Sequence, residues 1–402
     1  CQHGVKVADR VGRGHAAALD YGFEHLQQAQ VHVAELAQHG ALAGGGFYLH
    51  KLASERGYLL LQRIMAGANN ACIPFLETAM SFAVIDETTT APRMDAAWLD
   101  AHWMPFTANR NFKAKPRMIV GGQGAYYTDA EGRKIFDGLS GLWCSGLGHG
   151  RTEVAQAIGR AAATLDYAPA FQFGHPASFA LANKIKELTP AGLDYVFFTG
   201  SGSESADTSL KMARAYWRAK GQGTKTRLIG REKGYHGVNF GGISVGGIVA
   251  NRKLFGQGVE ADHLPHTQPP AGSFHKGMPP TGKELADRLL EVIALHDASN
   301  IAAVIVEPFS GSAGVVIPPV GYLQRLREIC TQNNILLIFD EVISGFGRSG
   351  AWTGAEAFGV TPDILNFAKQ VTNGAQPLGG VVATKEIYDT FMAAGGPDYM
   401  LE

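Results

Sequence analysis

Residues 301–340 read IAAVIVEPFSGSAGVVIPPVGYLQRLREICTQNNILLIFD, and this stretch decides the fold. Its two ends, Ile301–Val306 and Ile335–Phe339, are short apolar runs rich in β-branched residues, which suits strands buried on both faces. Between these runs, Tyr322–Asn333 has a helical spacing of apolar residues, namely Leu323, Leu326, Ile329 and Cys330. A strand, a crossover helix and a second strand predict a parallel pair in an α/β sheet.

The alternation of strand and helix continues on both sides of this unit, from Arg151 onward. Tyr195–Phe198 (YVFF) predicts a strand, Leu228–Ile229 lies in a weaker one, and Asp363–Ala368 (DILNFA) predicts another. The residues after YVFF continue into a long helical pattern through Leu210, Ala213 and Trp217. We therefore expect an α/β domain whose sheet is mostly parallel and flanked by helices.

Composition and charge exclude several classes of protein. The 402 residues are 46% hydrophobic, and 35 basic residues nearly cancel 36 acidic ones to leave a formal charge of -1, so nothing recruits nucleic acid or an anionic membrane. No apolar stretch approaches the roughly 20 residues needed to cross a bilayer. The cysteines, Cys1, Cys72, Cys144 and Cys330, form no CxxC pair, so we expect no disulfide framework, no metal site and a cytoplasmic location.

The first 93 residues differ in character from the rest, because they hold six of the 14 histidines but only two lysines. His25, His32 and His39 would recur along one face of a helix, but seven residues span about 10 Å of helix axis, too far for one metal ion to be shared. We expect an ordinary solvated face. We also expect the natural polypeptide to start at Met80 or Met94, with extraneous residues before it.

Polar residues follow the predicted strands, at the carboxyl ends where open parallel sheets bind ligands. Thr199–Glu204 (TGSGSE) precedes the helical pattern and suits either a phosphate-binding turn or an ordinary helix cap. Asp340 and Glu341 follow ILLIF, where Asp340 taken alone is a candidate helix cap or a partner of Arg348. Lys369 follows DILNFA and precedes a glycine-containing turn, a position unlike that of an ordinary solvated lysine.

Seven motifs occur along the chain in an order and spacing that together are highly specific. They are Asp100–Pro105 (DAHWMP), Gly141–Cys144 (GLWC), Pro169–Pro176 (PAFQFGHP), Gly234–Val238 (GYHGV), Ile301–Pro308 (IAAVIVEP), Ile335–Val342 (ILLIFDEV) and Ala368–Gly374 (AKQVTNG). With these motifs the chain, from about Leu99 onward, resembles the class III, fold-type I aminotransferases that use pyridoxal phosphate. Within that family it is most similar to the omega-amino acid:pyruvate aminotransferases, also called β-alanine:pyruvate transaminases.

The resemblance implies a pyridoxal 5'-phosphate cofactor and two catalytic residues. Lys369 would bind the cofactor covalently and, once freed by the substrate, act as the base that moves the substrate's proton. Asp340 would pair with the pyridine nitrogen of the cofactor. Its negative charge would keep that nitrogen protonated, so that the ring draws electrons from the substrate.

The resemblance also implies the residues that surround the cofactor and the substrate. The expected contacts are Ser201, Gly202 and Ser203 for the phosphate; Tyr235, His236, Val342 and Glu307 for the ring and its surroundings; and Trp143 and Phe171 for the substrate pocket. Tyr235 would stack on one face of the ring and Val342 would pack on the other. Phe171 fits an ordinary core position equally well.

The domain organisation is expected to follow the family. Residues 1–93 form an atypical, extraneous extension, residues 94–150 the N-terminal segment of a small domain, and residues 151–402 the large cofactor-binding domain with a seven-stranded sheet. The chain stops at Glu402, before the C-terminal part of the small domain. In the family, the residues beyond this point include a threonine that binds the partner subunit's phosphate and an arginine that receives a substrate carboxylate.

The implied reaction is transamination. An amine or omega-amino acid such as β-alanine gives its amino group to the cofactor, and pyruvate then takes it to become alanine. Because active sites of this family form across a subunit interface, a homodimer or a dimer of dimers is expected. Two alternatives stay open: another class III activity, on ornithine derivatives, diaminopelargonate or glutamate semialdehyde, and a truncated, non-catalytic remnant.

Overall fold

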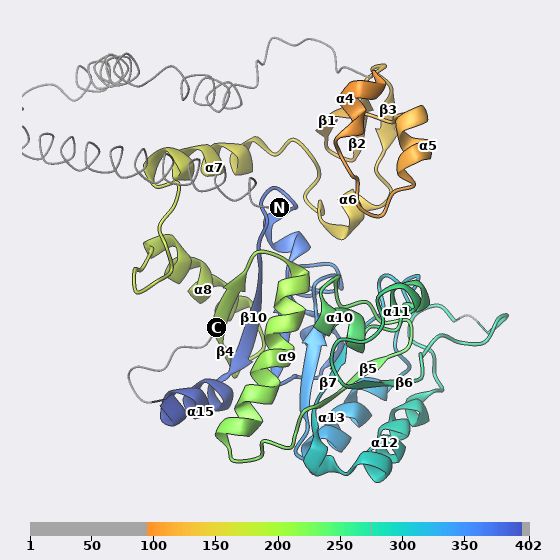
Figure 1. Ribbon diagram of the computed structural model, residues 1–402, viewed down its shortest axis with the longest axis vertical. Coiled ribbons are helices and arrows are strands. Elements are labelled where there is room, and N and C mark those ends of the chain that lie inside the picture. The colour runs from red at the N-terminus through yellow and green to blue at the C-terminus, as the bar shows by residue number, and fades with distance from the viewer. Residues whose placement is uncertain (1–94, 274, 396–402) are drawn as a thin grey trace, which may run out of the picture. The chain divides into compact units, whose positions relative to one another are not determined.

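The computed structural model describes residues 95–273 and 275–395 (Figure 1). The chain divides into two units, Cys1–Thr90 and Ala91–Glu402, and the described residues all belong to the second. The predictions made for the first 93 residues, on the histidine spacing and the starting methionine, therefore lie outside the described residues. No helix within the described ranges is both long enough and apolar enough to span a membrane.

A seven-stranded sheet forms the centre of the described chain, in the order β4-β10-β9-β8-β7-β5-β6. Its neighbouring pairs are parallel except for the two that involve β10, which runs antiparallel to both β4 and β9. The predicted mostly parallel, seven-stranded sheet is therefore confirmed. Its strands are β4 Leu193–Thr199, β5 Arg227–Arg231, β6 Ala261–Leu264, β7 Ile301–Val306, β8 Leu336–Asp340, β9 Ile364–Phe367 and β10 Gly379–Thr384.

Helices flank the sheet, as predicted. Short 3-10 turns occur at η1 Lys283–Asp287, η2 Ala298–Asn300 and η3 Lys369–Thr372. The α-helices are α4 Ala96–Asp100, α5 Asn109–Ala114, α6 Ser140–Trp143, α7 Thr152–Thr164, α8 Pro176–Leu188, α9 Gly202–Ala219, α10 Phe240–Val245, α11 Val249–Phe255, α12 Arg288–His296, α13 Tyr322–Gln332, α14 Gly354–Phe358 and α15 Lys385–Gly395.

Two hydrophobic clusters hold these helices against the sheet. One joins α9, α10 and α15 to side chains of the strands, and the other joins α12 and α13 to a second set of strand side chains. All six residues of β7 are buried, as its uninterrupted apolar sequence predicts. The four apolar positions predicted for the crossover helix are all buried in α13, and Figure 1 shows α9 running along the sheet.

Some strands were not predicted from the sequence. β6 reads ADHL and is a short strand at the edge of the sheet, and β10 reads GGVVAT, in which two glycines resemble a turn. A separate three-stranded antiparallel sheet was also missed; it consists of β1 Ile119–Gln123, β2 Tyr126–Asp129 and β3 Lys134–Phe136. Short strands that contain glycine or charged residues carry little periodic signal.

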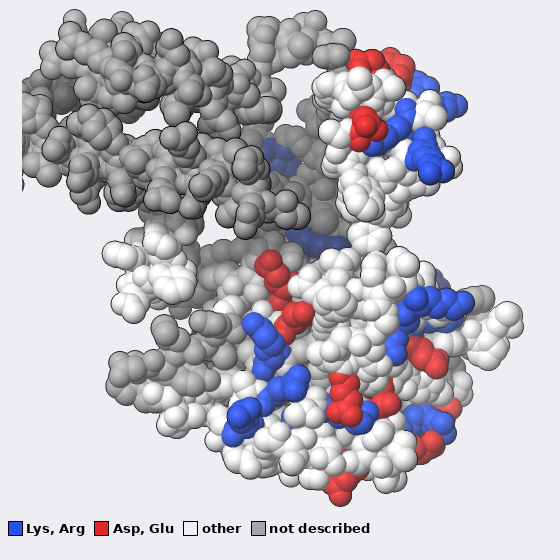
Figure 2. All heavy atoms as spheres, viewed as in Figure 1, with Lys and Arg blue, Asp and Glu red and all other residues white. Residues whose placement is uncertain are grey.

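Charged side chains of both signs are interspersed over the described part of the face shown in Figure 2. This distribution agrees with the near-zero formal charge of -1 for the whole chain. A surface that binds the phosphate backbone of nucleic acids is usually a continuous basic patch. The face in Figure 2 carries no such patch among its described residues.

Lys225 joins several segments at the amino edge of the sheet, before β5 begins. Its side chain is 3% exposed, and its Nζ donates to the carbonyl oxygens of Ala298 at 2.8 Å and Asn334 at 2.8 Å. A third carbonyl, that of Ile301, accepts at 3.3 Å, and the amine also lies 4.4 Å from the centre of the Trp217 ring. Burial lowers the pKa of Lys225 to about 8, so most of the amine is still protonated at neutral pH.

We expect Lys225→Met to lower the free energy of unfolding by about 2–4 kcal/mol, because methionine fills the space but leaves buried carbonyl oxygens without their donor. The measurement is urea unfolding followed by circular dichroism. Lys184→Met is the control, since Lys184 is exposed and pairs only with Glu187 at the surface; its expected effect is within about 0.5 kcal/mol. Equal effects of the two variants would contradict the role given to Lys225.

Candidate active site

The chemically important residues lie at the carboxyl edge of the sheet. Asp340 is the last residue of β8, and Glu307 directly follows β7. Lys369 begins η3, two residues after β9 ends, and Ser201 follows β4 as the N-cap of α9. β4, β7, β8 and β9 all run in the same direction, because β10 is antiparallel to both of its neighbours. Their carboxyl ends therefore share one edge of the sheet, as the sequence predicts.

Asp340 is a buried carboxylate with two well-defined partners. Its side chain is 5% exposed, and Oδ2 lies 2.7 Å from Nδ1 of His236, whose side chain is fully buried. The backbone N–H of Val342 donates to Oδ1 at 3.1 Å. The alternative pairing of Asp340 with Arg348 is not what the structure contains, since the Arg348 guanidinium donates to Gln370 at 3.2 Å instead. The carboxylate is thus held in one orientation.

The pair formed by His236 and Asp340 leaves one ring nitrogen of the histidine without a partner. Nε2 of His236 is buried and makes no hydrogen bond within the described residues. Tyr235, the residue before it, is half-buried, and burial together with the neighbouring Asp340 charge raises the pKa of its hydroxyl. The structure therefore brings Tyr235, His236 and Asp340 together, and their predicted roles toward a cofactor stay predictions.

Lys369 adopts a backbone conformation that is uncommon for a residue with a side chain. Its φ is +51°, in the left-handed region, where non-glycine residues are infrequent and usually held by their surroundings. The turn that follows is fixed by hydrogen bonds from the N–H of Asn373 to the oxygen of Gln370 at 3.0 Å and from Ala375 to Thr372 at 3.0 Å. Lys369 is half-buried.

The N-terminus of α9 lies at the same edge of the sheet. The Ser201 side chain accepts from the N–H of Glu204 at 3.2 Å, so Ser201 acts as the helix cap that the TGSGSE sequence allows. A Cβ atom at Gly202 would lie 2.9 Å from Cγ1 of Val342, so only glycine fits there. The Oγ of Ser203 accepts from the N–H of Val238 at 3.0 Å. The partial positive charge of this 18-residue helix therefore faces the edge where Val342 lies.

Glu307 is buried, and among the described residues its carboxylate accepts from backbone donors. Oε2 accepts from the N–H of Tyr235 at 3.3 Å and Oε1 from Gly311 at 3.1 Å. Burial raises the pKa of Glu307 to about 7, although the charges of His236 and Arg231 oppose that shift. Glu307 thus lies next to the segment that carries Tyr235 and His236.

Arg231 is a residue that the sequence analysis did not single out. It is 1% exposed at the end of β5, and its guanidinium donates to the Glu307 carbonyl at 2.8 Å and to Oγ of Ser310 at 2.7 Å. The available signal was an arginine that ends an otherwise apolar strand, RLIGR, since a buried arginine is rare unless it is paired. It supports the loop that follows Glu307.

Trp143 and Phe171 lie on segments outside the central sheet. The segment after Trp143 is tied to the turn after Lys369, because the N–H of Leu147 donates to Oδ1 of Asn373 at 2.9 Å. The charges of Lys369 and Arg348 also act on Cys144, where burial nevertheless raises the pKa of the thiol. Phe171 is 78% exposed, so the core position considered for it is wrong. The assignment of Trp143 and Phe171 to a substrate pocket stays a prediction.

Comparison with known proteins agrees with this arrangement. Residues 107–400 match the protein family described as aminotransferase class-III. The chain is 65% identical over 305 residues, which are 76% of this chain and 68% of the relative, to the beta-alanine–pyruvate aminotransferase of Pseudomonas aeruginosa. It is 60% identical over 306 residues, which are 76% of this chain and 68% of the relative, to the omega-amino acid–pyruvate aminotransferase of Pseudomonas putida.

Solved structures give the same result. An (S)-enantioselective omega-transaminase from Thermomicrobium roseum is similar with a TM-score of 0.71 and 37% identity, over 76% of this chain and 69% of that one. An amine transaminase from an uncultivated Pseudomonas species, solved in its PLP-bound form, is similar with a TM-score of 0.69 and 36% identity, over 75% of this chain and 70% of that one. The family match, the sequence identities and the sheet with its lysine, aspartate and helix N-terminus at one edge lead to one conclusion: this chain belongs to the class III aminotransferases.

Proposed function

We propose that this chain transfers an amino group from an omega-amino acid or amine, such as β-alanine, to pyruvate, giving alanine, with pyridoxal phosphate as its cofactor. Two observations carry the proposal. The named relative from Pseudomonas aeruginosa is 65% identical, and Asp340 ends β8 while Lys369 lies two residues after the end of the adjacent strand β9. Both curated relatives described above are named for pyruvate as the second substrate.

The residues at the sheet edge fit this cofactor in chemistry. The half-buried amine-bearing residue Lys369 suits an aldehyde; a buried carboxylate, Asp340, suits a protonated ring nitrogen; and the N-terminus of α9 suits a phosphate. The close approach of Gly202 to Val342 supports the fit, because any side chain at position 202 would fill the space beside the helix N-terminus. We assign the phosphate to Ser201, Gly202 and Ser203 on this basis.

When bound, pyridoxal phosphate supplies an electron sink for the carbon from which the substrate loses its proton. The Asp340 carboxylate would hold a proton on the ring nitrogen, and its contacts with His236 and the Val342 N–H keep it oriented for that task. The amine of Lys369 removes the proton from the amine-bearing carbon of the donor. Tyr235 and Val342 would hold the two faces of the ring, and Glu307 supports the segment that carries Tyr235.

We also propose a homodimer, supported by aromatic side chains that the described chain leaves in solvent. Trp103 is 88% exposed, Phe106 84%, Tyr167 75% and Phe173 73%. Large aromatic surfaces are rarely left in water unless they bind a partner, and aromatic residues are enriched in interface cores. A second copy of this chain is the partner we propose. We further propose a cytoplasmic location, with which the free thiols of Cys144 and Cys330 agree.

The test of the proposed reaction is alanine formation from pyruvate by the purified chain with added pyridoxal phosphate. We expect β-alanine to serve as amino donor and to outperform ornithine derivatives and glutamate semialdehyde. Alanine would be measured by chromatography of the reaction mixture. A preference for an ornithine derivative would move the chain to another activity of the same family, and a sample that binds no cofactor would contradict the proposal altogether.

Lys369→Ala should lower the rate of alanine formation by about 10³-fold, within the range expected for loss of a positioned base. In the wild-type chain, borohydride reduction followed by peptide mass spectrometry should locate the cofactor on Lys369. The exposed Lys184→Met variant serves as the control and should retain both the activity and the tag. Finding the tag on any other lysine would refute the assignment of Lys369.

Asp340→Asn should lower turnover by about 100-fold or more, the magnitude seen when one electrostatic group is removed from an active site. Asparagine keeps the size and one acceptor oxygen, so the Val342 contact can remain while the charge is lost. The absorbance spectrum of the bound cofactor should shift as the ring nitrogen loses its proton. Asp389→Asn, at an exposed ion pair with Lys385, is the matched control; unchanged turnover in Asp340→Asn would rule out its role.

Replacing Trp103 and Phe106 together by serine should raise the dissociation constant of the dimer by about tenfold or more, because two large apolar anchors are removed. Sedimentation velocity over a range of concentrations measures this constant. Leu295→Ser, at a 77% exposed position on α12, is the control. A wild-type chain that sediments as a monomer at every concentration would contradict the proposed dimer.

A further inference from the structure

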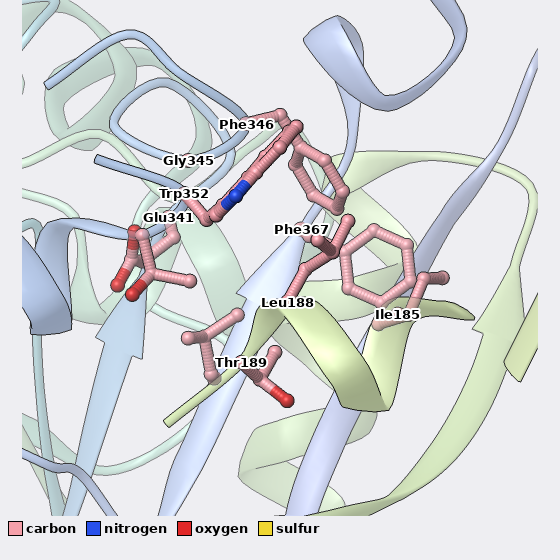
Figure 3. A pocket seen from close by; sticks show the side chains of 10 residues that line it. Ile185, Leu188, Thr189, Glu341, Gly345, Phe346, Trp352 and Phe367 are labelled. Atoms are coloured by element: carbon pink, nitrogen blue, oxygen red, sulfur yellow. The ribbon is translucent and has the colours of Figure 1, made fainter. Parts of the chain in front are cut away.

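The loop between β8 and α14 forms one wall of a small internal cavity. We call residues 341–353 the β8–α14 loop. Figure 3 shows Glu341 at this cavity together with Phe346 and Trp352 of the loop and Phe367 of β9. The other lining side chains are Ile185, Leu188, Thr189, Thr353 and Leu365. Glu341 is the one carboxylate in an otherwise mostly apolar lining, so its presence requires a reason.

The carboxylate of Glu341 is 1% exposed and has backbone and hydroxyl donors as partners. Oε1 accepts from the N–H of Ala355 at 2.7 Å, and Oε2 accepts from the N–H of Gly354 and from Oγ of Ser344 at 3.2 Å. Burial raises the pKa of Glu341 to about 7, while these same donors oppose the shift. A buried carboxylate is costly unless such donors compensate it, so this contact set is specific.

These contacts join the two ends of the β8–α14 loop. Glu341 is its first residue, while Gly354 and Ala355 begin the helix that follows its last. The helix does not depend on Glu341 for its side-chain cap, because the N–H of Glu356 already donates to Oγ1 of Thr353 at 3.0 Å. Glu341 therefore does something that the ordinary cap does not do: it fixes the distance between the two ends of the loop.

The loop that Glu341 closes also touches the parts of the proposed cofactor site. Asp340 directly precedes Glu341, and the N–H of Val342 orients the Asp340 carboxylate. The Val342 side chain packs against Gly202 at the N-terminus of α9. Further along, Arg348 donates to Gln370, the residue after Lys369, at 3.2 Å. A shift of the β8–α14 loop would therefore move Asp340, Val342 and the turn that contains Lys369 relative to one another.

We propose that Glu341 is a positioning residue: by closing the β8–α14 loop, its carboxylate holds Asp340 and Val342 in place for the cofactor ring. This inference rests on the proposed function, since it concerns the same cofactor site. Glu341 touches neither the substrate nor the reacting atoms. Its effect passes through the backbone that joins it to Asp340 and Val342.

The experiment compares three variants in the full chain, first freed of cofactor. Glu341→Gln keeps the size but turns one acceptor oxygen into an N–H₂ donor facing backbone donors. Thr353→Ala removes the helix cap, and Glu291→Gln makes the same charge change at an exposed position on α12, where Glu291 pairs with Arg288. For each, the dissociation constant for pyridoxal phosphate is measured by fluorescence quenching, and the melting temperature of the cofactor-free chain by calorimetry. Hydrogen exchange reports on the amides of the loop.

We expect Glu341→Gln to weaken cofactor binding by about tenfold or more and to speed amide exchange in the β8–α14 loop. Thr353→Ala should lower the melting temperature by a similar amount yet leave the dissociation constant within about twofold, and Glu291→Gln should change neither. Glu341→Asp, which keeps the charge one methylene shorter, should restore part of the affinity. It also replaces Glu341→Gln in the comparison if that variant does not fold.

Equal cofactor affinity in Glu341→Gln and Thr353→Ala, at equal loss of melting temperature, would overturn the inference while leaving the proposed function intact. A wild-type chain that does not bind pyridoxal phosphate would instead overturn the proposed function, and the inference with it. The two failures are thus separated by the wild-type binding curve.

Discussion

The Asp340 carboxylate is buried at the end of a central strand, and a charge in that position is stable only if other segments bring donors to it. His236 comes from the segment after β5, and the Val342 N–H from the start of the next loop. The arrangement of the other site residues follows from the need to stabilise the Asp340 charge. The segments that satisfy the charge are the same ones that carry the residues proposed to contact the cofactor, so folding and site assembly depend on one set of contacts.

The sheet makes this arrangement possible because several strands with no sequence proximity end at one edge. β7 delivers Glu307, β8 delivers Asp340, and β9 leads to Lys369. Carboxylates that are buried near one another must each have a separate set of hydrogen-bond donors, and the structure provides these donors. Glu307 is bound by backbone N–H groups and Asp340 by an imidazole, so the two carboxylates do not compete for the same partner.

The sequence was sufficient for the strands at the centre of the sheet, because those on either side of α13 are uninterrupted apolar runs, and strand ends then indicate where Asp340 and Lys369 must lie. The residues that contact the site from other segments were harder to predict from the sequence. The contact between Arg231 and Glu307 joins residues 76 positions apart, and that between Glu341 and Gly354 spans 13, so no local pattern reveals them. The pocket roles of Trp143 and Phe171 stay predictions.

The direction of β10 has a consequence for the amine of Lys369. In an ordinary βαβ unit, the chain leaves the active edge after each strand and returns only at the opposite end of the sheet. Because β10 is antiparallel to β9, residues 368–378 leave and re-enter the sheet at the same edge, as a short connection whose two ends are fixed by the strands. A short connection of this kind has little conformational freedom to lose. If Lys369 binds the cofactor as proposed, its amine would therefore search only a small volume to reach the carbonyl carbon of the cofactor.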